Sequence, residues 1–366
     1  MTAELAIDLG PDRIIGSYRL VREIGRGGMG TVYEAEHVVL PRRAAIKIMH
    51  PELRKQPGMA TRVVQEAAIL EDIKHPGIVG VYDCALLPDH RPWIAMELVV
   101  GETLANRLLQ QGPLPATEVA KLLSDVADVL ASVHAKGVVH RDLKPDNLIL
   151  TPNDRDFPLR VIDWGVARLG PMGRLTLDGL TPGTPIYMSP EQATGRNIAA
   201  PCDIYSLGVI AYEALTGHPP FDGRTLAEVV SMHLMSEVAP LRERCGAPKD
   251  LCELVHRMLS KDPSVRPSAI EIRQLARMIA LEMTTAYESL EIDGLDRSSG
   301  APRHVAIAAA PTEDAVVVDP EALEFGVTEL VPTIRRPRWT PQMGSVPVAP
   351  RSACDQVAGE ISPKRR

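Results

Sequence analysis

One short segment, VVHRDLKPDNLIL at positions 138–150, constrains this chain more than any other part of its sequence. Between two apolar runs it holds charged and hydrogen-bonding side chains close together, among them His140, Arg141, Asp142, Lys144 and Asn147. A pattern this specific does not arise by chance. The segment therefore predicts a site of chemistry, and the rest of the sequence has to be interpreted around it.

The periodicity along the chain predicts two units of different character. Before position 100, short alternating or apolar runs (YRLVREI, TVYEAE, AAIKIM, IVGVYDCAL and PWIAMELV) predict a small sheet, and residues 61–74 predict a helix that ends before a proline. Beyond Gly101, apolar residues at three-and-four spacing predict helices over 117–134, 203–216, 226–236, 250–259 and 269–287. After about residue 290 the periodicity is lost, which predicts a flexible tail.

Composition excludes some classes of function. A net charge of −7 argues against nucleic-acid binding, because a basic face is needed to neutralise phosphates, and favours proteins as partners. The five cysteines are scattered, with no CxxC pair, and predict reduced structural thiols rather than a metal site. With neither a long apolar run nor a basic N-terminus, the sequence predicts a cytoplasmic protein without a membrane span.

A glycine-rich motif follows the first strand. Gly25, Gly27 and Gly30 form GxGxxG, in which the missing side chains let backbone N–H groups approach phosphate oxygens. The same motif marks dinucleotide-binding folds, but there a helix follows, whereas here the β-type run TVYEAE follows. The context favours a lid between two antiparallel strands, with Val32 packed on a base or, in the simpler interpretation, in the strand core.

Lys47 lies among apolar residues in AAIKIM, where an ammonium is costly unless it has an anionic partner or reaches solvent. Glu66, in the helix that follows, is the best candidate for that partner. A Lys47–Glu66 pair would aim the ammonium at phosphates. A solvated lysine and an ordinary surface glutamate are the alternative.

With these motifs in order, the chain resembles the eukaryotic-type protein kinases, and in detail their bacterial Ser/Thr branch, over about residues 17–280. The resemblance implies an α+β, bilobal fold with a small β-rich N-lobe (17–100) and a larger helical C-lobe (101–280). An N-terminal extension (1–16) and the flexible tail (281–366) flank this kinase domain. The implied activity is transfer of the ATP γ-phosphate to protein Ser or Thr hydroxyls.

The resemblance implies roles for the central segment. Asp142 would accept the proton of the attacking hydroxyl, Lys144 would contact the γ-phosphate, and Asn147 would bind a metal ion. In VIDWGVAR, Asp163 matches the family's metal-binding Asp, and Trp164 stands where the family usually has Phe. We expect this aromatic exchange to alter packing without loss of metal binding.

The resemblance also implies the nucleotide site and its cofactors. ATP and Mg²⁺, or Mn²⁺, would bind beneath the glycine-rich lid, with Ile24 beside it. WIAMELVVGETL resembles the hinge, which makes Met96 the gatekeeper, and backbone groups of Glu97 and Val99 would hydrogen-bond adenine.

A further set of residues is implied to be structural. Thr184 in GTPIYMSPEQ resembles the residue of the acceptor platform that bonds near the catalytic Asp, Glu191 would pair with Arg266, and Asp203 matches the family's central C-lobe helix.

Regulation is implied by Arg141, which in similar kinases pairs with a phosphate on the activation loop. Thr176 and Thr181 are the candidate acceptors in that loop, with Thr176 preferred, and the chain itself would be an early substrate, in a dimer or otherwise. Two alternatives remain. A nucleotide-binding pseudokinase scaffold would bind ATP without transfer, and a small-molecule kinase of related fold would lack the GTPxYxSPE segment seen here.

Overall fold

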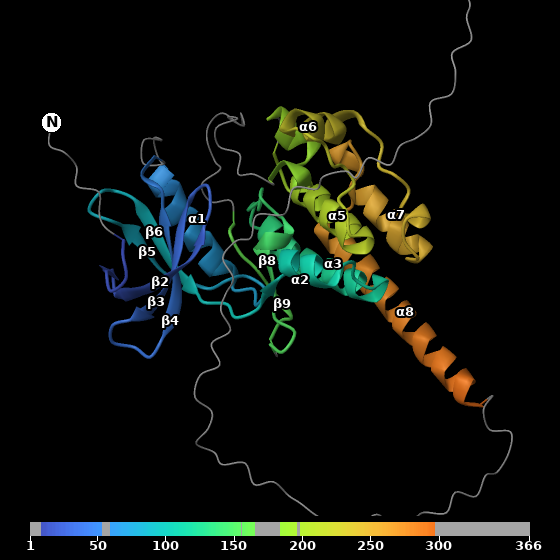
Figure 1. Cartoon of the computed structure of the whole chain (residues 1–366), viewed down its shortest axis with the longest axis horizontal. Coiled ribbons are helices and arrows are strands. Elements are labelled where there is room, and N and C mark those ends of the chain that lie inside the picture. Colours follow the sequence, from blue (N-terminus) through green and yellow to red (C-terminus); the bar gives the residue numbers. More distant parts are fainter. Residues whose placement is uncertain (1–8, 53–58, 155, 165–183, 196–197, 297–366) are drawn as a thin grey trace, which may run out of the picture. The chain divides into compact units, whose positions relative to one another are not determined.

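The computed structural model describes residues 9–52, 59–154, 156–164, 184–195 and 198–296. The chain divides into two compact units, 1–326 and 327–366, and the second lies wholly outside the described residues. In the first unit, an N-terminal antiparallel sheet with one helix is followed by a mostly helical part (Figure 1). The predicted α+β class, β-rich first and helical second, is confirmed.

The N-terminal sheet has the strand order β1-β2-β3-β4-β6-β5. Its strands are β1 (Ile14–Ile15), β2 (Tyr18–Arg26), β3 (Gly30–His37), β4 (Arg43–Met49), β5 (Val81–Leu86) and β6 (Pro92–Glu97), and α1 (Met59–Ile73) is its helix. In β2 the alternation places Tyr18 and Leu20 inward, where they join Ile46 and Trp93 in a core cluster of this sheet. The predicted strands and the helix before His75 are therefore confirmed.

The helical part is built around α5. Its helices are α2 (Leu104–Gln111), α3 (Ala116–His134), α4 (Pro190–Thr194), α5 (Pro201–Thr216), α6 (Leu226–Met235), α7 (Lys249–Met258) and α8 (Ala269–Asp296). From Cys202 to Leu215 every residue of α5 is buried, which makes this helix the centre of the part. α3 buries the predicted apolar face, including Val119, Leu123 and Leu130, and packs against α5 and α8.

Several short elements have no sequence signal strong enough to predict them. α2 has eight residues, and the second sheet consists of β7 (Glu102–Thr103), β8 (Leu148–Leu150) and β9 (Leu159–Val161) in that order. Runs of two or three residues are too short to show a period of two. This sheet is nevertheless important, because β8 follows Asn147 and β9 precedes Asp163.

The last helix is longer than predicted. Residues 281–296 continue α8 to Asp296, so the expected flexible tail from 281 is wrong for these residues, while the domain end at 280 stays a prediction. Beyond the predicted helix end at 287, the helix formers Glu288, Leu290 and Glu291 follow, and no proline interrupts the segment up to Asp296. Propensity without strong amphipathic periodicity is sufficient here to extend a helix that is already nucleated.

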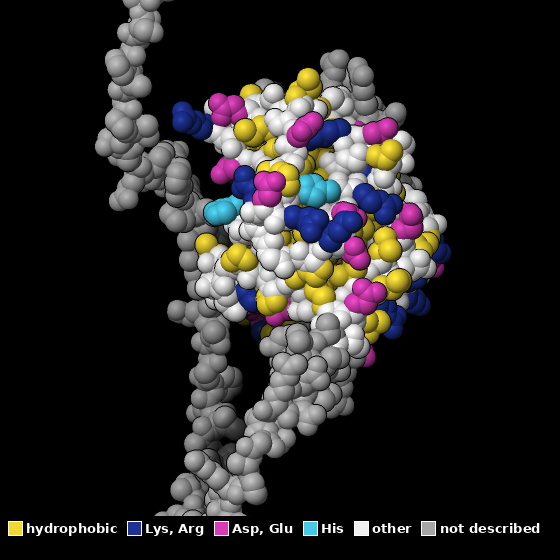
Figure 2. Space-filling model, turned by 90° about the vertical axis from the view of Figure 1, so that its right-hand side faces the viewer, with side chains coloured by type: hydrophobic (Ala, Val, Ile, Leu, Met, Phe, Trp, Pro, Cys, Tyr) yellow, Lys and Arg dark blue, Asp and Glu magenta, His cyan; other side chains and the backbone are white. Residues whose placement is uncertain are grey.

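No described helix is both long enough and apolar enough to cross a membrane. Figure 2 shows the face that lies on the right in Figure 1, where basic and acidic side chains alternate with apolar ones.

Asp125 on α3 provides a test of pH dependence. Burial and the nearby Asp128 carboxylate raise its pKa from 3.8 to about 6. The folded state opposes ionisation of the Asp125 carboxyl group, so the protein loses stability as the pH rises from about 4 to about 6. The variant Asp125→Asn cannot ionise and therefore does not suffer this loss. Because the side chain is partly exposed, we expect Asp125→Asn to raise the free energy of unfolding by about 1 kcal/mol at pH 8, below the full value of such a shift.

Urea denaturation of the wild type and Asp125→Asn at pH 4 and pH 8 measures this effect. The account requires the gain at pH 8 to shrink toward zero at pH 4. A gain of equal size at both pH values would contradict it.

Candidate active site

A lysine and an aspartate from distant parts of the chain meet at the centre of the site. Lys47 on β4 places its Nζ 2.7 Å from Oδ1 of Asp163, which follows β9. Burial raises the pKa of Asp163, but the charge and hydrogen bond of the Lys47 ammonium outweigh burial, so the pKa lies below its usual value. The backbone of Asp163 is left-handed, with a φ of 56°, a conformation that costs about 1–2 kcal/mol for such a residue.

Buried Asp203 on α5 holds the loop that contains the charged segment. Its two carboxylate oxygens accept hydrogen bonds from the backbone N–H groups of His140 and Arg141, both at 2.8 Å. His134 Nε2 lies 2.9 Å from the same carboxylate. Burial raises the pKa of Asp203, yet the hydrogen bond and charge of His134 help to bring it below its usual value. This anchor fixes Arg141 in a left-handed conformation with a φ of 65°.

The next three polar residues of the loop lie together. Lys144 Nζ is 3.4 Å from Asp142 Oδ2, and Asn147 Nδ2 donates to the backbone oxygen of Asp142 at 2.8 Å. The Asn147 backbone oxygen accepts from the N–H of Ile162 at 3.0 Å, so the loop is bonded to the residue before Asp163. Because β8 and β9 pair antiparallel, with Leu148 opposite Val161, residues 147 and 163 flank the same end of that ladder.

Trp164 is buried beside this ladder. Its Nε1–H donates to the backbone oxygen of Val161 at 3.2 Å, and its ring centroid lies 4.7 Å from that of His140. A buried indole N–H needs a partner, and this one has it. The exchange of the family's Phe for Trp thus adds a hydrogen bond that a Phe side chain has no donor to make.

Trp164, Lys47 and Asp163 line one narrow cavity of about 50 Å³. The other lining residues are apolar and come from the glycine-rich segment, β4, α1 and the strands around the hinge: Met29, Met49, Ala67, Leu70, Val79, Val81, Ile94 and Met96. Met96, the predicted gatekeeper, is one of these lining residues, and its role at the base stays a prediction. Met29, inside the glycine motif, is a lining residue that sequence reasoning missed, since a loop methionine carries no periodic signal.

The three glycines of the motif differ in what they permit. A Cβ on Gly30 would lie 2.4 Å from the backbone oxygen of Ile48, so only glycine lets β3 approach β4 there. Around Gly25 and Gly27 a Cβ would meet no atom within 4 Å, so packing does not require glycine at either position. Open space over exposed backbone suits a bound phosphate chain. Val32, half-buried, is paired with Lys47 across the strands.

Glu97 is the last residue of β6 and Val99 lies two residues beyond it, and both are half-buried. The N–H of Glu97 donates to the backbone oxygen of Gly80 at 2.8 Å, so its own contribution to a bound base would come from its carbonyl oxygen. Its carboxylate accepts from the N–H of Gly80 at 3.3 Å and lies 3.6 Å from Arg160. Ile24, at the end of the YRLVREI run, is also half-buried.

Arg266 and Glu191 form the predicted ion pair. Two Arg266 nitrogens contact the two carboxylate oxygens at 2.6 and 3.0 Å, and the Arg266 side chain is 0% exposed. The next residue, Gln192, donates from Nε2 to the backbone oxygen of Arg141 at 2.7 Å. Gln192 thereby ties α4 to the charged loop, a contact that no motif predicted.

Part of the prediction lies outside the described residues. Thr176 and Thr181 belong to the segment 165–183, and the side chains of Glu66 and Thr184 are also outside the description. Glu66 belongs to α1, and Thr184 begins the 3-10 turn η4 (Thr184–Tyr187). The Lys47–Glu66 pair therefore stays a prediction, while Lys47 pairs with Asp163.

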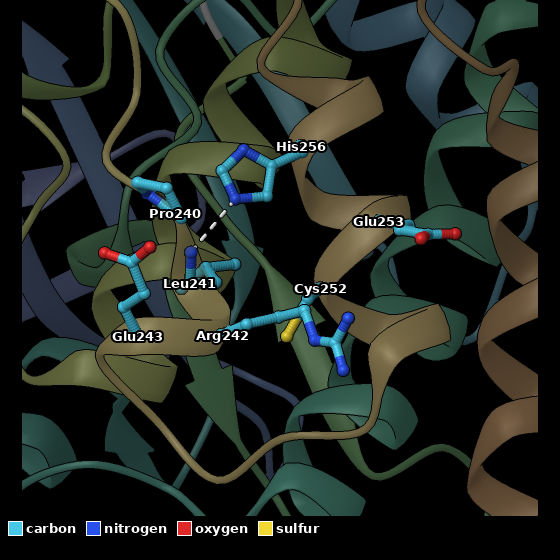
Figure 3. A pocket seen from close by; sticks show the side chains of 7 residues that line it. All are labelled: Pro240, Leu241, Arg242, Glu243, Cys252, Glu253 and His256. Atoms are coloured by element: carbon cyan, nitrogen blue, oxygen red, sulfur yellow. Dashed lines mark hydrogen bonds between the residues drawn. The ribbon is translucent and has the colours of Figure 1, made fainter.

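A larger cavity, of about 500 Å³, lies between α7 and the chain segment before it (Figure 3). It is lined by Pro240, Leu241, Arg242, Glu243, Cys252, Glu253 and His256. Burial lowers the pKa of His256, whose Nε2 accepts from the backbone N–H of Leu241 at 3.1 Å. This nitrogen is therefore occupied by a structural hydrogen bond between α7 and the segment before it. None of the predicted site residues lines this cavity. The smaller cavity is the better candidate for the site, because Lys47 and Asp163 line it.

The donor set suits a weakly held magnesium-type ion. Asp163 offers a carboxylate and Asn147 an amide oxygen, whereas the described residues contain no group of three His, Cys, Asp or Glu side chains able to hold a metal alone. Mg²⁺ is commonly bound by one or two such oxygen ligands together with phosphates and water. The residues therefore fit a metal ion that arrives with a nucleotide.

Comparisons with known proteins point to one family. A model of the protein kinase domain matches residues 18–276. The chain is 39% identical to the serine/threonine-protein kinase pkn2 of Myxococcus xanthus over 77% of this chain and 34% of that protein. It is 33% identical to PknH of Mycobacterium tuberculosis over 84% of this chain and 49% of PknH. The chain thus spans between a third and a half of the length of these relatives.

Solved structures agree on the fold. The Mycobacterium tuberculosis PknI kinase domain, crystallised as a double mutant, superposes with a TM-score of 0.59 at 24% identity, over 75% of this chain and all of that domain. At this identity the likeness concerns the fold. The expected bilobal architecture is confirmed by it.

Proposed function

The chain belongs to the protein kinase domain family, and on this premise we propose that it is an ATP-dependent Ser/Thr protein kinase. The observation that carries the proposal is the meeting of Lys47 with Asp163 beside the loop of Asp142, Lys144 and Asn147. These are the groups that phosphoryl transfer needs, since the reaction depends on positioning and charge neutralisation more than on covalent help.

In the proposed reaction the acceptor is a Ser or Thr hydroxyl of a protein. Asp142 accepts the hydroxyl proton as the oxygen bonds to the γ-phosphorus, and the bond from that phosphorus to the β-γ bridging oxygen breaks, releasing ADP. Lys144, 3.4 Å from Asp142, adds positive charge where the phosphoryl group passes. The side chains of Asp142 and Lys144 are 15% and 20% exposed, which leaves a path for substrates.

The nucleotide would be held by groups from the glycine-rich segment, β4 and the hinge. Gly25, Gly27 and Gly30 cover its phosphates, Lys47 contacts the α- and β-phosphates, and Ile24, Val32 and Met96 pack around adenine, with backbone groups of Glu97 and Val99 bonding its edge. ATP and a divalent metal ion are general requirements of protein kinase domains; we infer Mg²⁺, replaceable by Mn²⁺, at Asn147 and Asp163. When bound, the ion neutralises phosphate charge.

A nucleotide-binding scaffold without transfer activity is the alternative. It is less well supported, because the residues required for transfer are all present in the sequence. Incubating the purified chain with γ-labelled ATP, Mg²⁺ and a mixture of generic protein substrates separates the two functions. Phosphoserine or phosphothreonine in the substrates supports a kinase. Measurable ATP binding with no labelled product supports the scaffold.

Phosphorylation of the activation loop is part of the proposal. Arg141 lies in the loop held by Asp203 and Gln192 and offers a cation to a phosphate on Thr176, or on Thr181. We expect Thr176→Ala to lower the steady-state rate by about tenfold, of the order of one or two charge-assisted hydrogen bonds. Rates measured on one exogenous substrate, with Thr312→Ala in the tail as the control, test this; a Thr176→Ala variant as fast as wild type would refute it.

Trp164 makes a separate contribution. We expect Trp164→Phe to lower kcat by about two- to fivefold, because losing the hydrogen bond to Val161 removes about 1 kcal/mol from the arrangement that keeps Asp163 against Lys47. Steady-state kinetics at saturating ATP measures the change. A variant with unchanged or higher kcat would show that the indole N–H has no part in holding that arrangement.

A further inference from the structure

A buried histidine on α6 contacts the 3-10 turn η4, which begins at Thr184, the residue that the family resemblance places in the acceptor platform. His233 is 0% exposed, and its Nε2 lies 3.0 Å from the backbone oxygen of Ile186 in η4. On its other side, Nδ1 lies 3.0 Å from the hydroxyl of Tyr205 on α5, which is also 0% exposed. One side chain therefore links the central helix to the 3-10 turn that begins at Thr184.

Lys261 lies at the far end of this series of hydrogen bonds, and its positive charge determines which group donates in each of them. Lys261, after α7, donates from Nζ to the Tyr205 oxygen at 3.5 Å and to the backbone oxygen of Met232 at 3.3 Å. Because an ammonium only donates, the Tyr205 oxygen accepts from it and its O–H is directed to Nδ1 of His233. Nε2 then carries the proton and donates to Ile186, which assigns the tautomer from the network.

The surroundings keep this imidazole neutral. The facing charged groups are Lys261, whose Nζ lies 4.2 Å from the Phe221 ring centroid, and Arg266, whose Cζ lies 4.9 Å from that of Tyr205. Phe221 meets the His233 ring edge-on at 5.1 Å. Burial and the Lys261 charge lower the pKa of His233 to about 4. A second proton would also leave the Tyr205 hydroxyl between two donors, with its own hydrogen unplaced.

The turn has further supports. Tyr187 donates from its hydroxyl to Glu213 at 2.6 Å, and Ser206 Oγ donates to the backbone oxygen of Tyr187 at 2.7 Å. These contacts fix the end of η4 on α5. At Ile186, two residues after Thr184, the turn is fixed by α6 instead, through His233.

We propose that neutral His233 is a positioning residue for the acceptor substrate, because its hydrogen bond to Ile186 sets the turn on which the acceptor Ser or Thr rests. The proposal depends on the proposed kinase function. It predicts that a change at His233 alters recognition of the acceptor while leaving ATP binding unchanged, since the nucleotide groups lie on other elements.

Two substitutions separate this role from packing. The amide of glutamine places a donor near the position of Nε2, so His233→Gln retains a donor for Ile186. Asparagine reaches only as far as Nδ1, so His233→Asn retains a partner for Tyr205 and loses the bond to the turn. His218→Gln, an exposed histidine of the same lobe, is the control.

The experiment measures kcat, the KM for ATP and the KM for a Thr-containing peptide selected from an arrayed library as the best wild-type substrate. We expect His233→Asn to raise the peptide KM about tenfold, the loss of one buried hydrogen bond. The KM for ATP should stay within about twofold, and His233→Gln should stay within about threefold of wild type in peptide KM.

Tyr205→Phe provides a second variant if His233→Asn does not fold. It keeps the ring beneath Arg266 and removes the hydroxyl that orients His233, so the peptide KM should rise by about threefold. The positioning role would be overturned if His233→Asn and His233→Gln raised the peptide KM equally. It would also be overturned if both variants lowered kcat and left the peptide KM unchanged. A wild type that phosphorylates no peptide would instead refute the kinase function itself.

Discussion

We expect Asp142→Asn to lower the rate of phosphoryl transfer by about 10²–10⁴, the range contributed by a positioned general base. The substitution preserves the shape of the side chain, and the bond from Asn147 to the Asp142 backbone oxygen at 2.8 Å does not depend on the carboxylate. Binding of ATP should therefore be unchanged. The measurements are kcat with a peptide substrate and the dissociation constant of a fluorescent ATP analogue.

Asp146→Asn is the matched control, because Asp146 is an exposed aspartate in the same short segment. It should leave both quantities within about twofold of wild type, as surface substitutions usually do. An Asp142→Asn variant with a rate within about tenfold of wild type would show that proton acceptance by this residue is not part of the reaction.

The second large effect concerns stability. Arg266→Met should lower the free energy of unfolding by about 3–5 kcal/mol, because it leaves the buried Glu191 carboxylate without the cation that contacts it at 2.6 and 3.0 Å. The same guanidinium also donates to the backbone oxygens of Ser260, Pro201 and Lys261, and these bonds are lost as well. Urea denaturation monitored by circular dichroism measures the difference.

Two controls sharpen this test. Arg273→Met removes a half-exposed pair with Asp128 and should cost less than about 1 kcal/mol. The double variant Glu191→Gln with Arg266→Met removes the stranded charge and should recover part of the loss. If Arg266→Met and Arg273→Met lower the free energy of unfolding equally, the prediction that burial makes the Arg266–Glu191 pair more important for stability is contradicted.

The extent to which the sequence predicted the site depends on what each signal encodes. The charged segment, the glycines and Lys47 lie in short motifs, and the structure brings Lys47, Asp163 and the loop of Asp142 together. Strands and long helices were predicted because burial on one face imposes a period. The short strands β7, β8 and β9 were not, because two or three residues show no period.

Contacts between remote segments were the hardest to predict. Gln192 bonds to Arg141, and His233 to Ile186, across 51 and 47 positions of the chain. Neither glutamine nor histidine carries a pattern that names its partner, since the pairing follows from tertiary packing alone. The extension of α8 to Asp296 was missed for the opposite reason, because local propensity sustains a helix there without a strong core-facing period.

The most direct test of the central claim is to locate phosphate on the chain itself. Wild type and Asp142→Asn are incubated with ATP and Mg²⁺, and the phosphorylated residues are mapped by mass spectrometry. The account predicts phosphate on Thr176 or Thr181 in the wild type and none in the variant. If the wild type binds ATP measurably but carries no phosphate after the incubation, the kinase account is contradicted and a nucleotide-binding scaffold is favoured.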